Sequence, residues 1–158
     1  MAKRCGADGE KAVSEKALLA EQYFKDGYNC CQAVVLAFTE EAGIERETAL
    51  RIASSFGGGM GRLREVCGAV SGMFMSAGLV KGYTSPTDTQ AKAEHYARIQ
   101  RLAAEFRKQN GAIVCRELLG LNETKSEAVP EQRTEAYYKK RPCAELVRCA
   151  AEILEKEL

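Results

Sequence analysis

The sequence predicts an all-α protein, a single-domain bundle of six or seven helices spanning residues 1–158. Apolar residues recur at helical spacing from Ser14 onward, and helix-start and helix-stop signals bracket these runs. No segment shows the sustained alternation of a half-buried strand. The length of 158 residues, 46% of them hydrophobic, suits one domain that buries about two-thirds of its unfolded surface.

The first two helices are defined by capping residues. Residues 1–13 are polar, and we expect them to be flexible. Ser14 is suited to the N-cap of a helix that ends at Gly27. Asn29 opens a second helix, with Gln32 three residues later in the capping-box position.

The middle of the chain predicts three further helices. One covers about 47–56 and runs into the glycine-rich segment 57–61, and a small-residue helix follows over about 65–80. Ser85 and Pro86 then form a start signal, with a cap residue followed by proline at the first helical position of a long amphipathic helix.

The last third of the chain is more polar. A short helix is predicted over 113–119, and residues 122–141 are expected to be mostly loop. Pro142 then starts a helix that runs to the C-terminus.

Composition excludes several classes of function. Lys and Arg total 23 and Asp and Glu total 22, so the clustered basic excess of a nucleic-acid-binding protein is missing. The single histidine, His95, excludes a multi-histidine zinc site. The uncharged stretch 66–80 is too short to span a bilayer, and the N-terminal residues lack an apolar signal core. We therefore expect a cytoplasmic protein with no membrane partner, in which thiols stay reduced unless they have a redox or metal-binding role.

Four of the seven cysteines fall at predicted helix starts, where backbone N–H groups and the helix dipole favour a thiolate and lower the pKa of a thiol. The residues three and four positions after each of them are largely apolar, as are those seven and eight positions after all but Cys115, whose predicted helix is too short. All four are therefore predicted to point inward and could meet. These helix-start cysteines are Cys30, Cys67, Cys115 and Cys143.

The other three cysteines do not fit this pattern. Cys5 lies in the polar N-terminal segment, and Cys149 is followed by charged residues that indicate a boundary position. Cys31 lies about 100° from Cys30 around the helix, so only one of the two can face a shared site squarely. Which of them does so is left open by the sequence.

The motifs around these cysteines resemble the C_GCAxxG_C_C family of redox-active proteins, over roughly residues 15–155. The segments that carry the resemblance are Gly27-Tyr28-Asn29-Cys30-Cys31-Gln32-Ala33-Val34, Phe56-Gly57-Gly58-Gly59-Met60-Gly61-Arg62, Cys67-Gly68-Ala69-Val70-Ser71-Gly72, Cys115-Arg116-Glu117-Leu118-Leu119-Gly120 and Arg141-Pro142-Cys143. The resemblance implies that the helix-start cysteines are the family's characteristic four. The domain is also similar to the non-haem part of split-Soret-type cytochromes, with which an iron–sulfur site is associated. Covalent haem is not expected, because the chain has no C-x-x-C-H.

Four inward cysteines suit three kinds of site. They can hold an iron–sulfur cluster, with [2Fe–2S] as our first expectation, or form dithiol pairs that cycle through disulfides, or bind a structural zinc ion (Zn) through all four thiolates. Nearby arginines could offset the negative charge of an iron–sulfur site. They are Arg62, Arg64, Arg116 and Arg141.

We expect an electron-transfer or redox module with a redox partner protein, more than an enzyme with its own substrate. The competing hypothesis is a non-redox module with filler or zinc-binding cysteines. Gly68, Gly72 and Ser76 recur every four residues and predict close approach of another helix, either internal or from a second copy, so a homodimer is left open.

Overall fold

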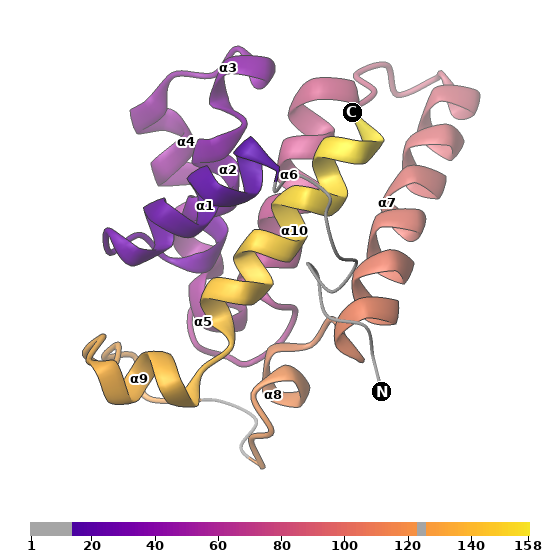
Figure 1. Ribbon diagram of the computed structural model, residues 1–158. Coiled ribbons are helices and arrows are strands. Elements are labelled where there is room, and N and C mark those ends of the chain that lie inside the picture. Colours follow the sequence, from indigo (N-terminus) through magenta and orange to yellow (C-terminus); the bar gives the residue numbers. More distant parts are fainter. Residues whose placement is uncertain (1–13, 123–125) are drawn as a thin grey trace.

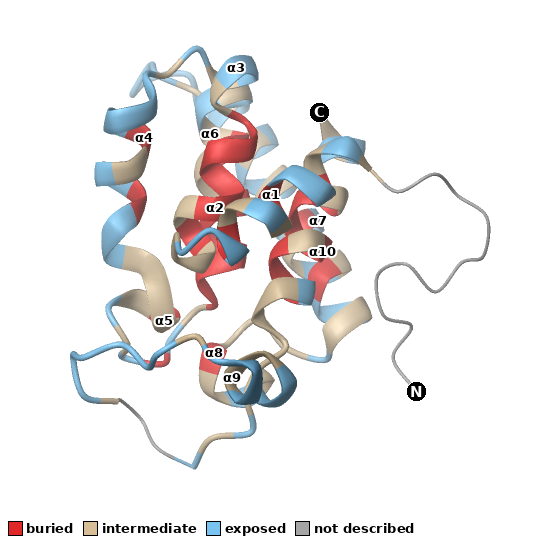
Figure 2. Ribbon diagram, turned by 60° about the vertical axis from the view of Figure 1, so that its left-hand side comes forward, coloured by how far each residue is buried: buried red, intermediate tan, exposed pale blue. Residues whose placement is uncertain are grey.

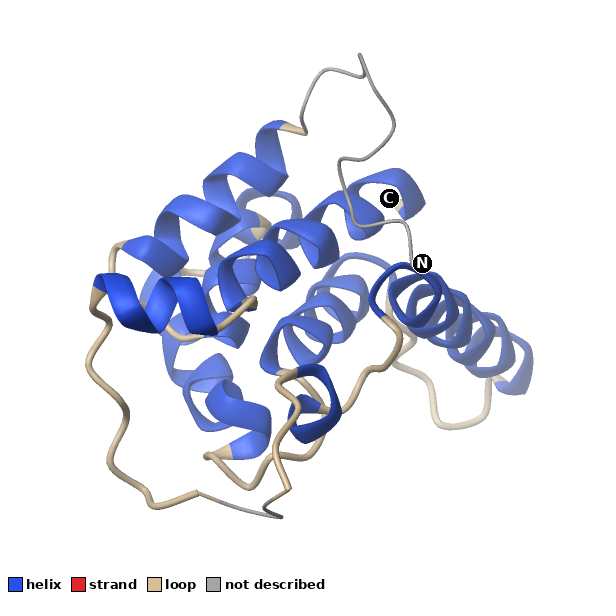
Figure 3. Ribbon diagram, turned by 60° about the horizontal axis from the view of Figure 1, so that its bottom comes forward, coloured by secondary structure: helices blue, strands red, loops and turns tan. Residues whose placement is uncertain are grey.

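The computed structural model describes residues 14–122 and 126–158, and its folded part is all-α, as the sequence predicts (Figures 1 and 3). The predicted flexibility of residues 1–13 lies outside the described residues. The helical elements are α1 (Glu15–Lys25), α2 (Cys30–Ala37), α3 (Thr39–Ala42), α4 (Arg46–Ala53), a 3-10 turn η1 (Ser54–Phe56), α5 (Gly57–Met60), α6 (Gly68–Lys81), α7 (Thr89–Asn110), α8 (Cys115–Leu118), α9 (Glu135–Lys140) and α10 (Cys143–Glu157).

The predicted caps form at the first two helices. The Ser14 side chain accepts a hydrogen bond from the backbone of α1. Asn29 and Gln32 form the complete capping box at the start of α2. The long helix α7 begins later than predicted, because Asp88 rather than Ser85 is its N-cap and accepts from the Ala91 N–H at 2.9 Å. The residues after Ser85 form a turn instead.

Helices α2, α6 and α10 form the centre of the bundle, and they carry most of its buried residues (Figure 2). Helix α1 packs on α10 and α2, while α7 lies outside against α6 and α10 (Figure 1). A Cβ on Gly72 would lie 2.8 Å from the Cys31 carbonyl oxygen, so the small-residue face of α6 is used for internal packing against α2. Because α2, α6 and α10 pack against one another in the core, their termini lie close together at the ends of the bundle.

The starts of α2, α6 and α10 lie at one end of the bundle, where α5, α8 and α9 are also found (lower part of Figure 1). Helix α9 forms within the segment 122–141, which was expected to be mostly loop, and Thr134 caps it. In the part of the chain that the structure describes, no helix is both long and apolar enough to cross a bilayer.

Candidate functional site at four helix starts

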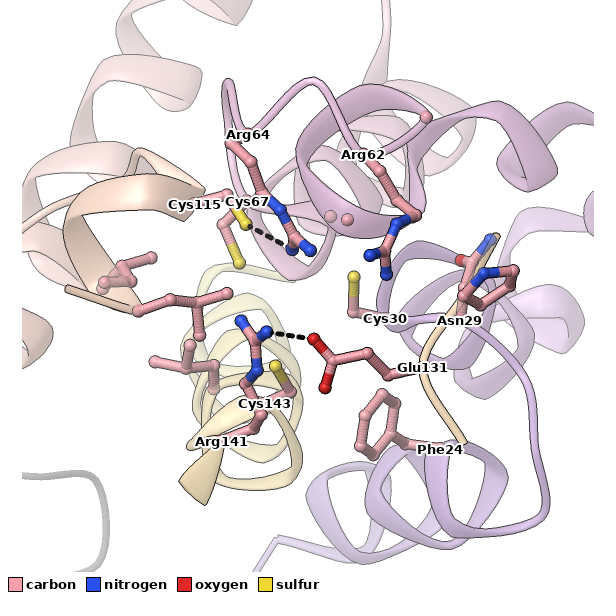
Figure 4. A pocket seen from close by; sticks show the side chains of 18 of the residues that line it. Phe24, Asn29, Cys30, Arg62, Arg64, Cys67, Cys115, Glu131, Arg141 and Cys143 are labelled. Atoms are coloured by element: carbon pink, nitrogen blue, oxygen red, sulfur yellow. Dashed lines mark hydrogen bonds and ion pairs between the residues drawn. The ribbon is translucent and has the colours of Figure 1, made fainter. Parts of the chain in front are cut away.

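The helix-start cysteines line one pocket of about 280 Å³ at this end of the bundle (Figure 4). Three of them are the first residues of α2, α8 and α10, and Cys67 is the N-cap of α6. All four are free thiols. The structure therefore brings together the four cysteines that the sequence selects, although they lie far apart along the chain.

Glycine residues, which have no side chain, make room for these cysteines. A Cβ on Gly68 would overlap Cys30 Sγ and lie 2.8 Å from the Phe56 carbonyl oxygen. A Cβ on Gly59 would lie 2.6 Å from the Cβ of Cys115. The glycines of the family-like motifs thus allow backbone to pass directly beside the sulfur-bearing side chains.

The glycine-rich segment forms a left-handed turn. Five consecutive residues, 58–62, have φ between 60° and 69°, and Met60 and Arg62 are not glycines. A non-glycine residue in this region is strained, and such strain concentrates at functional sites. Hydrogen bonds of 3.2 Å from Arg64 N–H to the Gly58 carbonyl and 3.0 Å from Glu65 N–H to the Gly59 carbonyl close the turn.

A short antiparallel bridge between Val66 and Val114 fixes two of the cysteines relative to each other. The Cys67 N–H donates to the Ile113 carbonyl at 2.8 Å, and the Cys115 N–H donates to the Glu65 carbonyl at 2.6 Å. The starts of α6 and α8 are therefore held side by side by main-chain hydrogen bonds.

Burial raises the pKa of three of these thiols, which contradicts the expected lowering. Desolvation raises the pKa of Cys30 and Cys67, and it raises the pKa of Cys143 to about 12. Backbone N–H groups do act in the predicted direction: those of Gly58 and Cys31 lower the pKa of Cys30. In a water-poor pocket, however, the cost of removing a thiolate from solvent exceeds the stabilisation from the helix starts.

Tyr137 is a pocket residue that the sequence analysis missed. Its hydroxyl interacts with the Cys143 thiol, and burial raises the pKa of the tyrosine. The signal for it was weak, because the tyrosine lies in a polar segment that was expected to be a solvated loop. Its ring packs edge-on against Tyr138, which in turn contacts Phe24 of α1.

Four arginines line the pocket: Arg62, Arg64, Arg133 and Arg141. Arg64 is the most buried, at 4% exposure, and its Nη1 lies 3.6 Å from Cys115 Sγ (Figure 4). Arg116, which was expected to help at the site, faces the Arg64 carbonyl and Glu65 instead and does not line the pocket. Arg133 lines the pocket in place of Arg116, and no sequence motif predicts a role for Arg133.

Residues 126–134, which we call the strap, cross the pocket. Arg62 Nε donates to the Glu127 carbonyl at 2.6 Å, and Arg64 Nε donates to Ser126 Oγ at 2.8 Å. At the other end of the strap, Arg133 donates to the carbonyls of Phe24 and Tyr28. The pocket arginines therefore also fasten the strap to the helix bundle.

The remaining described cysteines lie outside the pocket. Cys31 is fully buried on the other side of α2, with its sulfur 3.8 Å from Met75 Sδ. Cys149 is 1% exposed, so its predicted boundary position was wrong: it packs against α7 near Asn110, and it is disulfide-bonded. Cys5 is outside the described residues.

The chain matches a known sequence family over most of its length. The family model named "Putative redox-active protein (C_GCAxxG_C_C)" matches residues 28–157. The chain belongs to the C_GCAxxG_C_C family. No curated protein and no solved structure matched the chain.

In this C_GCAxxG_C_C protein, the helix-start cysteines are not arranged around a single point. Within residues 14–122 and 126–158, no three Cys, His, Asp or Glu side chains are close enough to hold one metal ion. The sulfurs are instead distributed around the walls of the pocket (Figure 4).

Proposed function

We propose that this protein is an electron-transfer or redox protein in which Cys30, Cys67, Cys115 and Cys143 hold an iron–sulfur cluster. The observation that carries the proposal is the presence of four free thiols, from four helix starts, around one pocket. An iron–sulfur cluster takes four cysteine ligands and supplies one-electron storage when bound. A separate redox partner protein would exchange electrons with it.

The distribution of the sulfurs favours a cluster over zinc. Tetrahedral zinc with sulfur ligands at about 2.3 Å requires the sulfurs to stand about 3.8 Å apart. No described group of three donors meets the requirement for one ion. In a cluster, different iron atoms bind different cysteines, so the ligand sulfurs stand farther apart.

The charge of the pocket also suits a cluster. Four thiolates give an iron–sulfur site a net negative charge, and four arginines with a single glutamate line this pocket. The N–H groups of Gly58 and Ala69, which interact with the Cys30 and Cys67 sulfurs, would stabilise the thiolates further. Metal binding would displace the thiol protons that burial otherwise retains.

The raised pKa values oppose a purely dithiol mechanism. The thiolate is the nucleophile in thiol–disulfide exchange, so a buried thiol with a raised pKa reacts slowly. In the described structure, Cys30, Cys67 and Cys143 have raised pKa values.

Anaerobic purification tests the proposal. We expect a coloured protein that contains iron and acid-labile sulfide and has visible absorption that bleaches on reduction. Single Cys→Ala variants at each of the four helix starts should lose the colour and the sulfide. Cys31→Ala is the matched control, because Cys31 is adjacent to Cys30 but outside the pocket, and it should retain both.

Other outcomes would contradict the proposal. A colourless protein with four rapidly reacting thiols would establish a dithiol function, and one bound zinc would establish a structural metal site. Loss of the cluster in Cys31→Ala, with retention in Cys30→Ala, would refute the ligand assignment.

A further inference from the structure

The proposed function leaves the position of Glu131 unexplained. This residue of the strap directs its carboxylate into the pocket of the helix-start cysteines (Figure 4). A carboxylate next to a thiolate-bound cluster adds a like charge, which is unfavourable. The carboxylate instead binds Arg141, with Nη2 and Oε1 2.6 Å apart.

The two partners of this ion pair differ in exposure. The Arg141 side chain is 12% exposed, whereas the Glu131 side chain is 47% exposed. An arginine cannot lose its proton in this environment, and a buried guanidinium without an anion is strongly unfavourable. The glutamate can return to water by moving the strap, but the arginine would then still require an anion.

Arg62 supplies a second cation without an acidic partner. Its Nε donates to the Glu127 carbonyl, and its guanidinium points into the pocket beside Cys30 (Figure 4). It makes no ion pair with any carboxylate among the described residues. Arg64 and Arg133 differ, because their donors are already directed at Ser126, Cys115 and the carbonyls of α1 and the following turn.

We propose that Arg62 and Arg141 form a binding subsite for a small carboxylate-bearing molecule, and that the Glu131 carboxylate occupies this subsite when the ligand is absent. Glu131 identifies the ligand class, because the subsite already binds a carboxylate at 2.6 Å. Guanidinium groups bind carboxylates in a fork geometry that a neutral molecule cannot reproduce. The ligand is small, because the whole pocket has a volume of about 280 Å³.

The inference goes beyond the proposed function and does not require a bound cluster. A tethered carboxylate competes with free ligand at an effective concentration set by the strap, so its removal should expose the subsite. Glu131→Gln should therefore bind acetate more tightly than the wild-type protein, by at least about tenfold.

Acetate titration followed by the side-chain Nε–H signals of arginine in NMR spectra tests this inference. The full chain is used as purified and again after removal of any metal by a chelator, with sodium chloride matched throughout. We expect saturable shifts of the Arg62 and Arg141 signals, with the tighter binding confined to Glu131→Gln. Inorganic phosphate serves as a second probe and should bind more weakly than acetate if the subsite selects carboxylates.

Glu127→Gln is the matched control, since it removes the same charge from an exposed side chain of the same strap and should bind acetate as the wild type does. Adding Arg62→Gln to Glu131→Gln should abolish the binding, and adding Arg141→Lys should weaken it. Because Arg141→Lys keeps the positive charge, it still tests the inference if the variant with Arg62→Gln does not fold. Equal acetate affinity in wild type, Glu131→Gln and Glu127→Gln would overturn the inference. Binding that is unchanged in the arginine variants would overturn it too. Neither outcome bears on whether iron and sulfide are present, so failure here is distinguishable from failure of the proposed function.

Discussion

Gly68 of α6 and Cys30 of α2 are in such close contact that any side chain at position 68 would overlap the Cys30 sulfur. Gly68 begins α6, directly after Cys67. The same residue therefore continues the helix that carries one pocket cysteine and leaves room for another. Its other close neighbours are backbone atoms, the Phe56 carbonyl oxygen and the Cys31 nitrogen, which cannot move as a flexible side chain would.

Gly68→Ala should destabilise the protein by about 1–3 kcal/mol, because overpacking outweighs the gain in helix propensity. It should also speed alkylation of Cys30 by displacing its sulfur from the pocket. Urea unfolding and the rate of thiol modification measure the two effects. Gly78→Ala in the same helix is the control: its nearest new contact is 3.9 Å away, at His95. We expect that variant to be stabilised by up to about 1 kcal/mol, and equal behaviour of the two variants would refute the argument.

Asn29 joins the start of α2 to the segment that leads into the glycine-rich turn. Its side chain accepts from the Gln32 N–H at 2.8 Å and donates to the Ser54 carbonyl at 3.1 Å. Asn29→Ala should lower the free energy of unfolding by about 1–2 kcal/mol, through loss of the cap and of this second bond. Asn29→Ser keeps the cap and should lose less. A comparison of thermal unfolding would contradict this account if serine were as destabilising as alanine.

Arg133 fastens one end of the strap. It donates to two carbonyls, and its guanidinium lies 3.9 Å from the centre of the Phe24 ring. Arg133→Lys preserves the charge but loses the fork of donors, so we expect faster cleavage of the strap in limited proteolysis. Gln132→Ala, at an exposed neighbouring position, should leave the cleavage rate unchanged. Equal protection of both variants would show that Arg133 does not hold the strap.

His95 gives the protein a pH dependence separate from the cysteine pocket. Partial burial and the nearby charge of Arg98 lower the pKa of His95 below its ordinary value of 6.5. The unfolded chain therefore takes up the proton at a higher pH than the folded chain. The contribution of neutral His95 to stability is complete above pH 6.5 and is lost as the pH falls through the lowered pKa.

The stability difference between wild type and His95→Gln should accordingly shrink as the pH is lowered below about 6.5. Urea unfolding at several pH values measures this difference, and an NMR titration of the imidazole gives the pKa directly. A midpoint at or above 6.5 would contradict the predicted direction.

Local signals in the sequence predict much of the fold, and they also identify the four cysteines that line the pocket. Asn29 and Gln32 have the spacing of a capping box, and the apolar residues that follow Cys30 predict its inward direction. Such signals depend on residues within one or two helical turns. The four pocket cysteines carry such local signals, so the sequence alone distinguishes them from the other three.

What the sequence could not predict depends on long-range contacts. Arg133 lies in a polar segment, and only the fold shows that it reaches α1. The raised pKa of Cys143 likewise depends on burial by distant residues, whereas a helix start alone predicts the opposite direction. The late start of α7 at Asp88 reflects competition between two acceptable caps, which periodicity cannot decide.

The packing of α1 against α10 has a consequence for how the chain matures. Ser14 and Glu155 are hydrogen-bonded across 141 positions, so this pairing closes one of the longest loops in the molecule. Contacts of such wide separation form slowly. Until they form, newly made chains expose several thiols at once to oxidants and to each other. Helix docking therefore competes with random disulfide formation, and keeping the chain reduced until its helices have docked should raise the yield of protein whose four pocket thiols are free.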